Sequence, residues 1–87
     1  MIMKVAVALL LLTTAAAVAG PNCTAEPKSR WLDEAAFREK IAGLGYAFKS
    51  VKVSGSCYEI YGRDKNGRRV DVYFDPITAQ VVEEHKG

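Results

Sequence analysis

The spacing of apolar residues predicts one helix in the first half of the chain. Phe37, Ile41 and Leu44 follow one another at intervals of four and three residues, which places them on one face of a helix. Asp33 precedes this stripe and is a good N-cap, because its carboxylate can accept hydrogen bonds from the amides of the first turn. Two glycines follow the stripe, and glycine readily adopts the left-handed backbone that ends a helix. We therefore predict a helix over residues 33–43.

Beyond residue 45, apolar and polar residues alternate in runs that are separated by turn residues. An alternation with a period of two is typical of a strand with one buried face. The predicted strands cover residues 46–53, 57–63, 69–74 and 80–84. A helix followed by a three- to four-stranded antiparallel meander is an α+β fold, with the helix laid across the apolar face of the sheet.

Turn residues join the predicted strands. Asn66-Gly67 is the most specific hairpin signal, because these residues tolerate the positive φ angles that a type I′ turn requires. Pro76 interrupts the third strand, and residues 76–79 are expected to form the last turn.

The first nineteen residues have the pattern of a cleavable signal peptide. A basic start is followed by an apolar run over residues 5–12, and residues 17–19 (Ala-Val-Ala) fit the motif for cleavage before Gly20. The apolar run is shorter than the roughly 20 residues that a membrane-spanning helix needs, so no stable membrane insertion is expected after cleavage. We expect a signal peptide over residues 1–19, a single domain over residues 20–87, and a periplasmic or secreted location.

Export makes the two cysteines informative. An even number of cysteines in a small exported chain indicates a disulfide, and Cys23 with Cys57 is the single intramolecular pairing available. The closed loop of about 35 residues corresponds to a stabilisation of about 3–4 kcal/mol. Lipid attachment at Cys23, just past the small-residue motif, is an alternative that fits less well, because Pro21 and Asn22 match the motif for lipid attachment poorly.

The sequence contains no convincing catalytic or metal-binding constellation. His85 and the two cysteines fall short of the four ligands of a structural zinc site, so no metal and no cofactor are expected. A lone histidine in a charged tail is a weak partner for a nucleophile. Glu59, Asp71 and Asp75 lie at spacings that suggest solvent-facing strand positions or a turn. We predict that the protein is not an enzyme.

Net charge excludes one further class of function. Twelve basic and ten acidic residues give a formal charge of +2, which provides no electrostatic argument for binding to nucleic acid.

The order of five short blocks carries a family resemblance. The blocks are Trp31-Leu32-Asp33-Glu34-Ala35-Ala36-Phe37, Gly45-Tyr46, Gly55-Ser56-Cys57-Tyr58-Glu59-Ile60, Asp64-Lys65-Asn66-Gly67-Arg68-Arg69-Val70 and Tyr73-Phe74-Asp75-Pro76-Ile77-Thr78. In this order they resemble the PepSY family, above all its small exported, cysteine-containing branch, over about residues 23–82. The chain departs from the family at Ala79, because the last turn of the family usually reads Asp-x-x-Thr-Gly.

This resemblance implies a helix packed on an antiparallel sheet, in a protein of the periplasm or of the extracellular space. PepSY units occur in protease propeptides and in standalone exported proteins, and a role in inhibiting or modulating peptidases has been proposed for them. The family has no known catalytic residues, and the matching positions of this chain are turns, caps and core. The implied role is therefore not assigned to any particular residue.

The candidate binding face is the side of the predicted sheet that lies opposite the helix. Tyr61 and Tyr73 fall on this side, beside Arg63 and Arg69 on neighbouring strands, and exposed Tyr and Arg are enriched at interfaces. A plain solvated face is the alternative, because cross-strand pairs of this kind stabilise any antiparallel sheet. The short last strand is a second candidate, as an edge that could accept an extended peptide.

Two hypotheses about function follow. The first is an exported, non-enzymatic regulatory module that binds a peptidase or a peptide segment and inhibits or modulates it. The second is a small structural protein of the cell envelope, or a sensor of a small ligand, with no peptidase target. The oligomeric state is not predicted.

Overall fold

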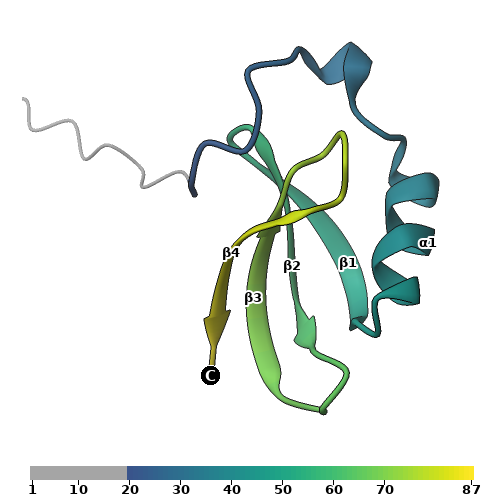
Figure 1. Cartoon of the computed structure of the whole chain (residues 1–87), viewed down its shortest axis with the longest axis vertical. Helices are drawn as coiled ribbons and strands as arrows, with labels where there is room; N and C mark the ends of the chain where they lie inside the picture. The colour runs from purple at the N-terminus through teal and green to yellow at the C-terminus, as the bar shows by residue number, and fades with distance from the viewer. Residues whose placement is uncertain (1–19) are drawn as a thin grey trace, which may run out of the picture.

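The computed structural model describes residues 20–87, in which a helix is followed by a four-stranded sheet (Figure 1). The elements are a short 3-10 helix η1 (Lys28–Arg30), helix α1 (Glu34–Gly43) and strands β1 (Ala47–Ser54), β2 (Cys57–Arg63), β3 (Arg69–Phe74) and β4 (Val81–Lys86). Each strand pairs antiparallel with its neighbour in the chain, in the order β1-β2-β3-β4. The predicted α+β fold is confirmed, while the predicted signal peptide over residues 1–19 lies outside the described residues.

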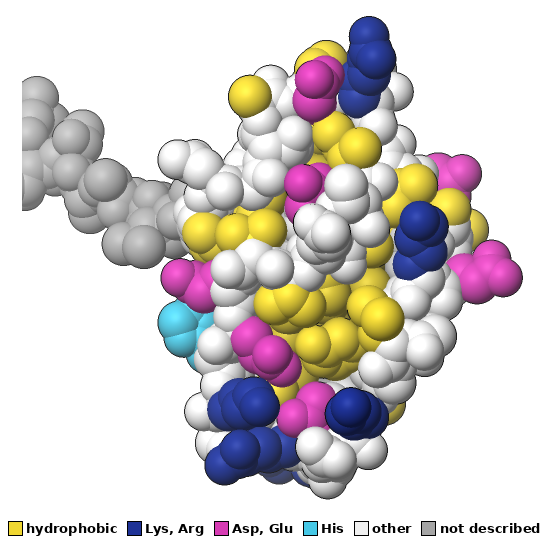
Figure 2. Space-filling view, viewed as in Figure 1, with side chains coloured by type: hydrophobic (Ala, Val, Ile, Leu, Met, Phe, Trp, Pro, Cys, Tyr) yellow, Lys and Arg dark blue, Asp and Glu magenta, His cyan; other side chains and the backbone are white. Residues whose placement is uncertain are grey.

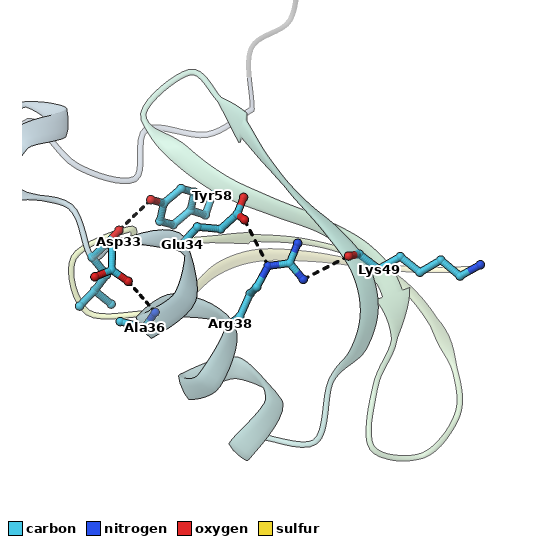
Figure 3. Close-up of polar contacts among 7 residues, drawn as sticks. Asp33, Glu34, Ala36, Arg38, Lys49 and Tyr58 are labelled. Atoms are coloured by element: carbon cyan, nitrogen blue, oxygen red, sulfur yellow. Dashed lines mark hydrogen bonds and ion pairs between the residues drawn. The ribbon is translucent and has the colours of Figure 1, made fainter.

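Helix α1 begins where the sequence predicts. The Asp33 carboxylate accepts a hydrogen bond from the Ala36 amide at 2.7 Å and caps the first turn (Figure 3). Phe37 and Ile41 are fully buried, as the apolar stripe predicts. Leu44 does not join the buried stripe and is 55% exposed, because α1 ends at Gly43, one residue before it.

The core lies between α1 and one face of the sheet. Alternate residues of β2 and β3 point toward the helix, and the buried cluster consists of Phe37, Ile41, Tyr58, Ile60, Val70, Val72, Phe74 and Ala79. The Phe37 ring lies 4.5 Å from that of Tyr58 and 5.3 Å from that of Phe74, measured between centroids. The Tyr58 hydroxyl donates to the Leu32 carbonyl at 2.7 Å, so this polar group is satisfied at the edge of the core (Figure 3).

Strand β1 contains an irregularity, and a side chain of α1 forms a hydrogen bond with the β1 backbone there. Its register with β2 shifts between Phe48 and Val51. Arg38 of α1 donates to the Lys49 carbonyl in this interval at 3.1 Å, and its Nε lies 3.3 Å from the Glu34 carboxylate (Figure 3). The helix is thereby tied to the edge of the sheet at the point where the regular ladder is interrupted.

The turn between β2 and β3 is not the predicted type I′ turn. The Gly67 amide donates to the Asp64 carbonyl at 2.9 Å, and Gly67 has a φ of 77°, but Asn66 does not have a positive φ. The Asp64 carboxylate instead accepts from the amides of Asn66 and Arg68, at 2.9 and 3.0 Å. Capping by Asp64 therefore selects a turn in which glycine alone adopts the left-handed conformation.

Ala79 keeps the left-handed turn that glycine would favour. Its φ is 62°, and its amide donates to the Asp75 carbonyl at 2.8 Å. A left-handed conformation costs a residue with a Cβ about 1–2 kcal/mol. The Ala79 side chain is 4% exposed and joins the core, and burying one methyl group offsets about 0.8 kcal/mol of that cost.

Candidate functional site

The Cys23–Cys57 disulfide fixes the residues that precede α1 to the start of β2, so the predicted pairing is confirmed. The Cys23 amide donates to the Ser56 hydroxyl at 2.9 Å, and the Pro21 carbonyl oxygen lies next to the Cys57 sulfur. Cys57 alternates with the core residues of β2 and faces away from α1. The chain from residue 20 to residue 23 therefore lies against the sheet face opposite the helix, which we call the outer face.

Gly20 lies directly on a side chain of the outer face. A Cβ at Gly20 would overlap the aromatic ring of Tyr73, so the backbone passes too close to this ring for any side chain. This contact explains why Tyr73 is half-buried, although it lies on the side of the sheet away from the core. The segment before Cys23 thus covers one part of the outer face and leaves the rest of it open.

The four residues of the predicted binding face all lie on the outer face. Tyr61 and Arg63 belong to β2, and Arg69 and Tyr73 belong to β3. Tyr61 is 57% exposed, and both arginines are exposed. The structure gathers three of the four in one place, because Tyr73 lies farther along the sheet beneath Gly20.

This place is an open hollow of about 560 Å³ near the β2–β3 turn. Its lining includes Tyr61, Arg63, Arg69, Asp71, His85 and Lys86. Arg63 donates to the Gly67 carbonyl at 2.9 Å, and the Arg69 side chain takes part in no ion pair within residues 20–87. Figure 2 shows Lys and Arg side chains gathered at the lower end of the molecule, where Figure 1 places this turn.

The prediction that Glu59 and Asp71 face the solvent is wrong, because both carboxyl groups are at least partly buried on the outer face. Glu59 is only 5% exposed, and its Oε2 atom has no hydrogen-bond partner within residues 20–87. The Oδ1 atom of Asp71 is likewise buried and unpartnered in this part of the chain. In the register of β2 and β3, Glu59 lies opposite Tyr73 and Asp71 lies opposite Tyr61, so the two acids are diagonal neighbours. We call Glu59 and Asp71 the carboxyl pair.

The family model described as peptidase propeptide and YPEB domain, or PepSY, matches residues 2–85. The chain belongs to the PepSY family. No curated protein and no solved structure matches the chain significantly. PepSY domains are propeptide-type or inhibitor-type modules and are generally not catalytic. Family membership and the disulfide are both consistent with an extracytoplasmic protein.

The electrostatics of this PepSY domain are unusual at the carboxyl pair. Burial, followed by the neighbouring Glu59 carboxyl, raises the pKa of Asp71 to about 6, while the charge of His85 acts in the opposite direction. Burial and the neighbouring Glu59 carboxyl raise the pKa of Tyr73 to about 12. The pKa of the exposed Tyr61 is also raised, mainly by the neighbouring Glu59 carboxyl. The outer face can therefore hold a proton or attract a cation at the carboxyl pair.

Residues 20–87 of the PepSY domain contain neither a metal-binding cluster nor a helix that could cross a membrane. No group of three or more His, Cys, Asp or Glu side chains within residues 20–87 could hold a metal ion. Helix α1 and the shorter η1, the helices of this part, fall short of the length and hydropathy that crossing a membrane requires.

Substitution of Asp71 tests the carboxyl pair. The test uses protein in which Gly20 is not a free N-terminus and its nitrogen is still part of an amide bond. In this protein, Asp71→Asn should raise the free energy of unfolding at about pH 7.5 by about 1–2 kcal/mol, because it removes the poorly solvated charge of the Asp71 carboxylate. The pKa of Asp71 in the folded domain lies above its ordinary value of 3.8, so the folded state binds this proton more tightly than the unfolded chain does. The stabilisation from this proton is complete below about pH 4 and is lost as the pH rises through about 6.

Urea unfolding at a series of pH values measures this effect. The Asp71→Asn variant should lose the part of the pH dependence between about pH 4 and pH 6 that wild type shows. Glu39→Gln removes an exposed carboxylate of α1 and is the matched control, which should keep the wild-type dependence. Identical pH profiles for Asp71→Asn and wild type would contradict the raised pKa.

Proposed function

We propose that this PepSY domain is an exported, non-enzymatic module that binds a peptidase, or a peptide segment of one, and inhibits or modulates it. The observation that carries the proposal is the open hollow on the outer face, where Tyr61, Arg63 and Arg69 come together. Family membership supplies the class of partner, because the family includes peptidase propeptides. In the proposal the residues of the hollow bind the partner and perform no chemistry on it.

The composition of the hollow suits a protein partner. Tyr61 presents a large exposed ring with little conformational freedom to lose, and tyrosine and arginine dominate the energetics of many interfaces. Arg69 has no carboxylate to bind within residues 20–87 and can pair with an acidic group of a partner. Tyr73 belongs to the same face, but in the proposal it contacts the partner less than Tyr61 does, because Gly20 covers its ring.

The proposal includes export and cleavage before Gly20, with a periplasmic or secreted product. The disulfide supports this location, because such bonds persist in oxidising compartments. Mass spectrometry of the protein recovered from its native cells tests the cleavage position directly.

A pull-down with the oxidised mature protein, residues 20–87, tests the function. Envelope and secreted fractions of the native organism are passed over wild type, over the Tyr61→Ala/Arg69→Ala variant and over a control. The control, Lys40→Ala/Leu44→Ala, removes a cation and an exposed apolar side chain at the end of α1. We expect wild type and control to retain a peptidase whose activity they reduce, and the Tyr61→Ala/Arg69→Ala variant to bind it at least about tenfold more weakly.

Three results would count against parts of this proposal. Equal binding by the Tyr61→Ala/Arg69→Ala variant would exclude the hollow as the contact surface. Binding without any change in peptidase rate would exclude inhibition or modulation. Recovery of no peptidase would favour the second candidate, a sensor of a small ligand or a structural envelope protein.

The size of the hollow keeps the small-ligand candidate in consideration. Its volume of about 560 Å³ falls in the range of about 300–1,000 Å³ that is usual for small-molecule sites. This candidate predicts that a ligand raises the melting temperature of wild type but not of the Tyr61→Ala/Arg69→Ala variant.

A further inference from the structure

The carboxyl pair lies close to the residue at which the proposed cleavage would create a new chain end. Gly20 packs against the half of the Tyr73 ring that carries Cδ1, Cε1 and Cζ. The Tyr73 hydroxyl extends from Cζ and neighbours the Glu59 carboxyl, which raises the pKa of this tyrosine. Tyr73 and Glu59 also lie opposite each other in the β2–β3 ladder. Gly20 and the Glu59 carboxyl therefore both neighbour the Tyr73 side chain.

The carboxyl pair lacks a cationic partner within the described residues. Two carboxylate oxygens are buried there without hydrogen bonds, although buried carboxylates are normally paired. Lys52 lies opposite Glu59 on β1, but its Nζ sits over the Tyr61 ring, 5.1 Å from the centroid. His85 lies opposite Asp71 on β4, and its Nε2 contacts the Glu83 carboxylate at 3.0 Å. Neither the Lys52 nor the His85 side chain therefore satisfies the two oxygens.

We propose that the carboxyl pair is the binding site for the α-ammonium group of Gly20 in the cleaved protein. This inference rests on cleavage before Gly20, which is part of the proposed function. Hydrolysis of the bond between Ala19 and Gly20 consumes one water molecule and leaves a carboxylate on Ala19 and an amine on Gly20. This amine takes up a proton at neutral pH and so places a positive charge beside the two acids.

The tether makes this binding favourable. The disulfide holds Cys23 to the outer face, only three residues after Gly20, so the ammonium group has little freedom to lose when it binds. The groups that surround the pair on the outer face are Lys52 of β1, Tyr61 of β2, Tyr73 of β3, and Glu83 and His85 of β4. The ammonium would join Lys52 near the pair, and it is the cation that cleavage supplies.

The position of Cys23 allows a direct test. A peptide thioester of residues 20–22 can be ligated to a chain that begins at Cys23, which gives the mature protein with either a free or an acetylated Gly20 amine. Ligation also introduces ¹⁵N at the Gly20 amine alone, so that its pKa can be measured by NMR. Urea unfolding of both oxidised proteins at neutral pH then gives the contribution of the ammonium group to stability.

We expect the free amine to lower the unfolding equilibrium constant about tenfold relative to the acetylated protein. In wild type, the pKa of this amine should lie above the ordinary range of about 7.7–8.0. In the Glu59→Gln/Asp71→Asn variant, the tenfold effect should shrink to less than about twofold. The matched control, Glu83→Gln, removes an exposed carboxylate of β4 and should keep the full effect.

Equal unfolding constants for the free and the acetylated wild-type proteins would overturn the inference. So would an amine pKa within its ordinary range, a measurement that needs no variant and holds even if the double variant fails to fold. The result is independent of the pull-down, because a domain that binds no peptidase can still bind its own terminus. Mass spectrometry separately reports whether cells produce the terminus at Gly20.

Discussion

Phe37→Ala should lower the free energy of unfolding by about 3–5 kcal/mol, which is the usual cost of truncating a buried phenylalanine. Phe37 is fully buried and links the helix to the sheet through the rings of Tyr58 and Phe74. Native proteins have total stabilities of about 5–15 kcal/mol, so the variant should lose a large share of its stability. Urea titration followed by circular dichroism measures the loss.

Leu44→Ala is the matched control for Phe37→Ala. Leu44 belongs to the same predicted apolar stripe but is 55% exposed, so its truncation should cost less than about 1 kcal/mol. Similar losses at the two positions would mean that α1 packs on the sheet in a different orientation from the one described.

The Cys23→Ala/Cys57→Ala variant should be less stable than wild type by about 3–4 kcal/mol, because it removes the constraint that the bridge places on the unfolded chain. Cys57 is fully buried, so the loss of its sulfur also leaves unfilled space under residues 20–23. Urea unfolding of the variant, and of wild type with and without reductant, measures the effect.

Reduced wild type is the internal comparison, and it should approach the stability of the double variant. Thiol labelling of unreduced protein should find no reactive cysteine, since both sulfurs are in the bridge. A double variant as stable as oxidised wild type would show that the bridge contributes nothing to the stability of the fold.

Local patterns predict most of this fold because the elements depend on near neighbours in the sequence. The spacing from Phe37 to Ile41 and the cap at Asp33 identify α1, and alternation identifies β2 and β3 almost to the residue. Each strand pairs with the next one along the chain, so short turns suffice to define the order of the sheet. Ala79 shows the limit of this reasoning, because its left-handed backbone is maintained by packing in the core.

The candidate site is less predictable because it depends on contacts between distant residues. Alternation correctly places Tyr61, Arg63, Arg69 and Tyr73 on the outer face, although their role as a binding face stays a prediction. Burial of Glu59 does not follow from alternation, which assigns it to the solvent side. It accompanies the coverage of the outer face by residues 20–23, and only the bridge to Cys57 and the strand register bring these parts together. Once that register is known, the diagonal positions of two acids in a hairpin indicate that their carboxyl groups lie close together.

The bridge also has a consequence for the order in which the protein is assembled. Residue 23 comes near the start of the folded part, but its partner belongs to the second strand. In a chain delivered amino end first, residues 20–23 cannot be fixed to the sheet until β2 has emerged, while α1 and β1 can already begin to form. Attachment of residues 20–23 to the outer face therefore follows the formation of β2, and closing the bridge requires an oxidant.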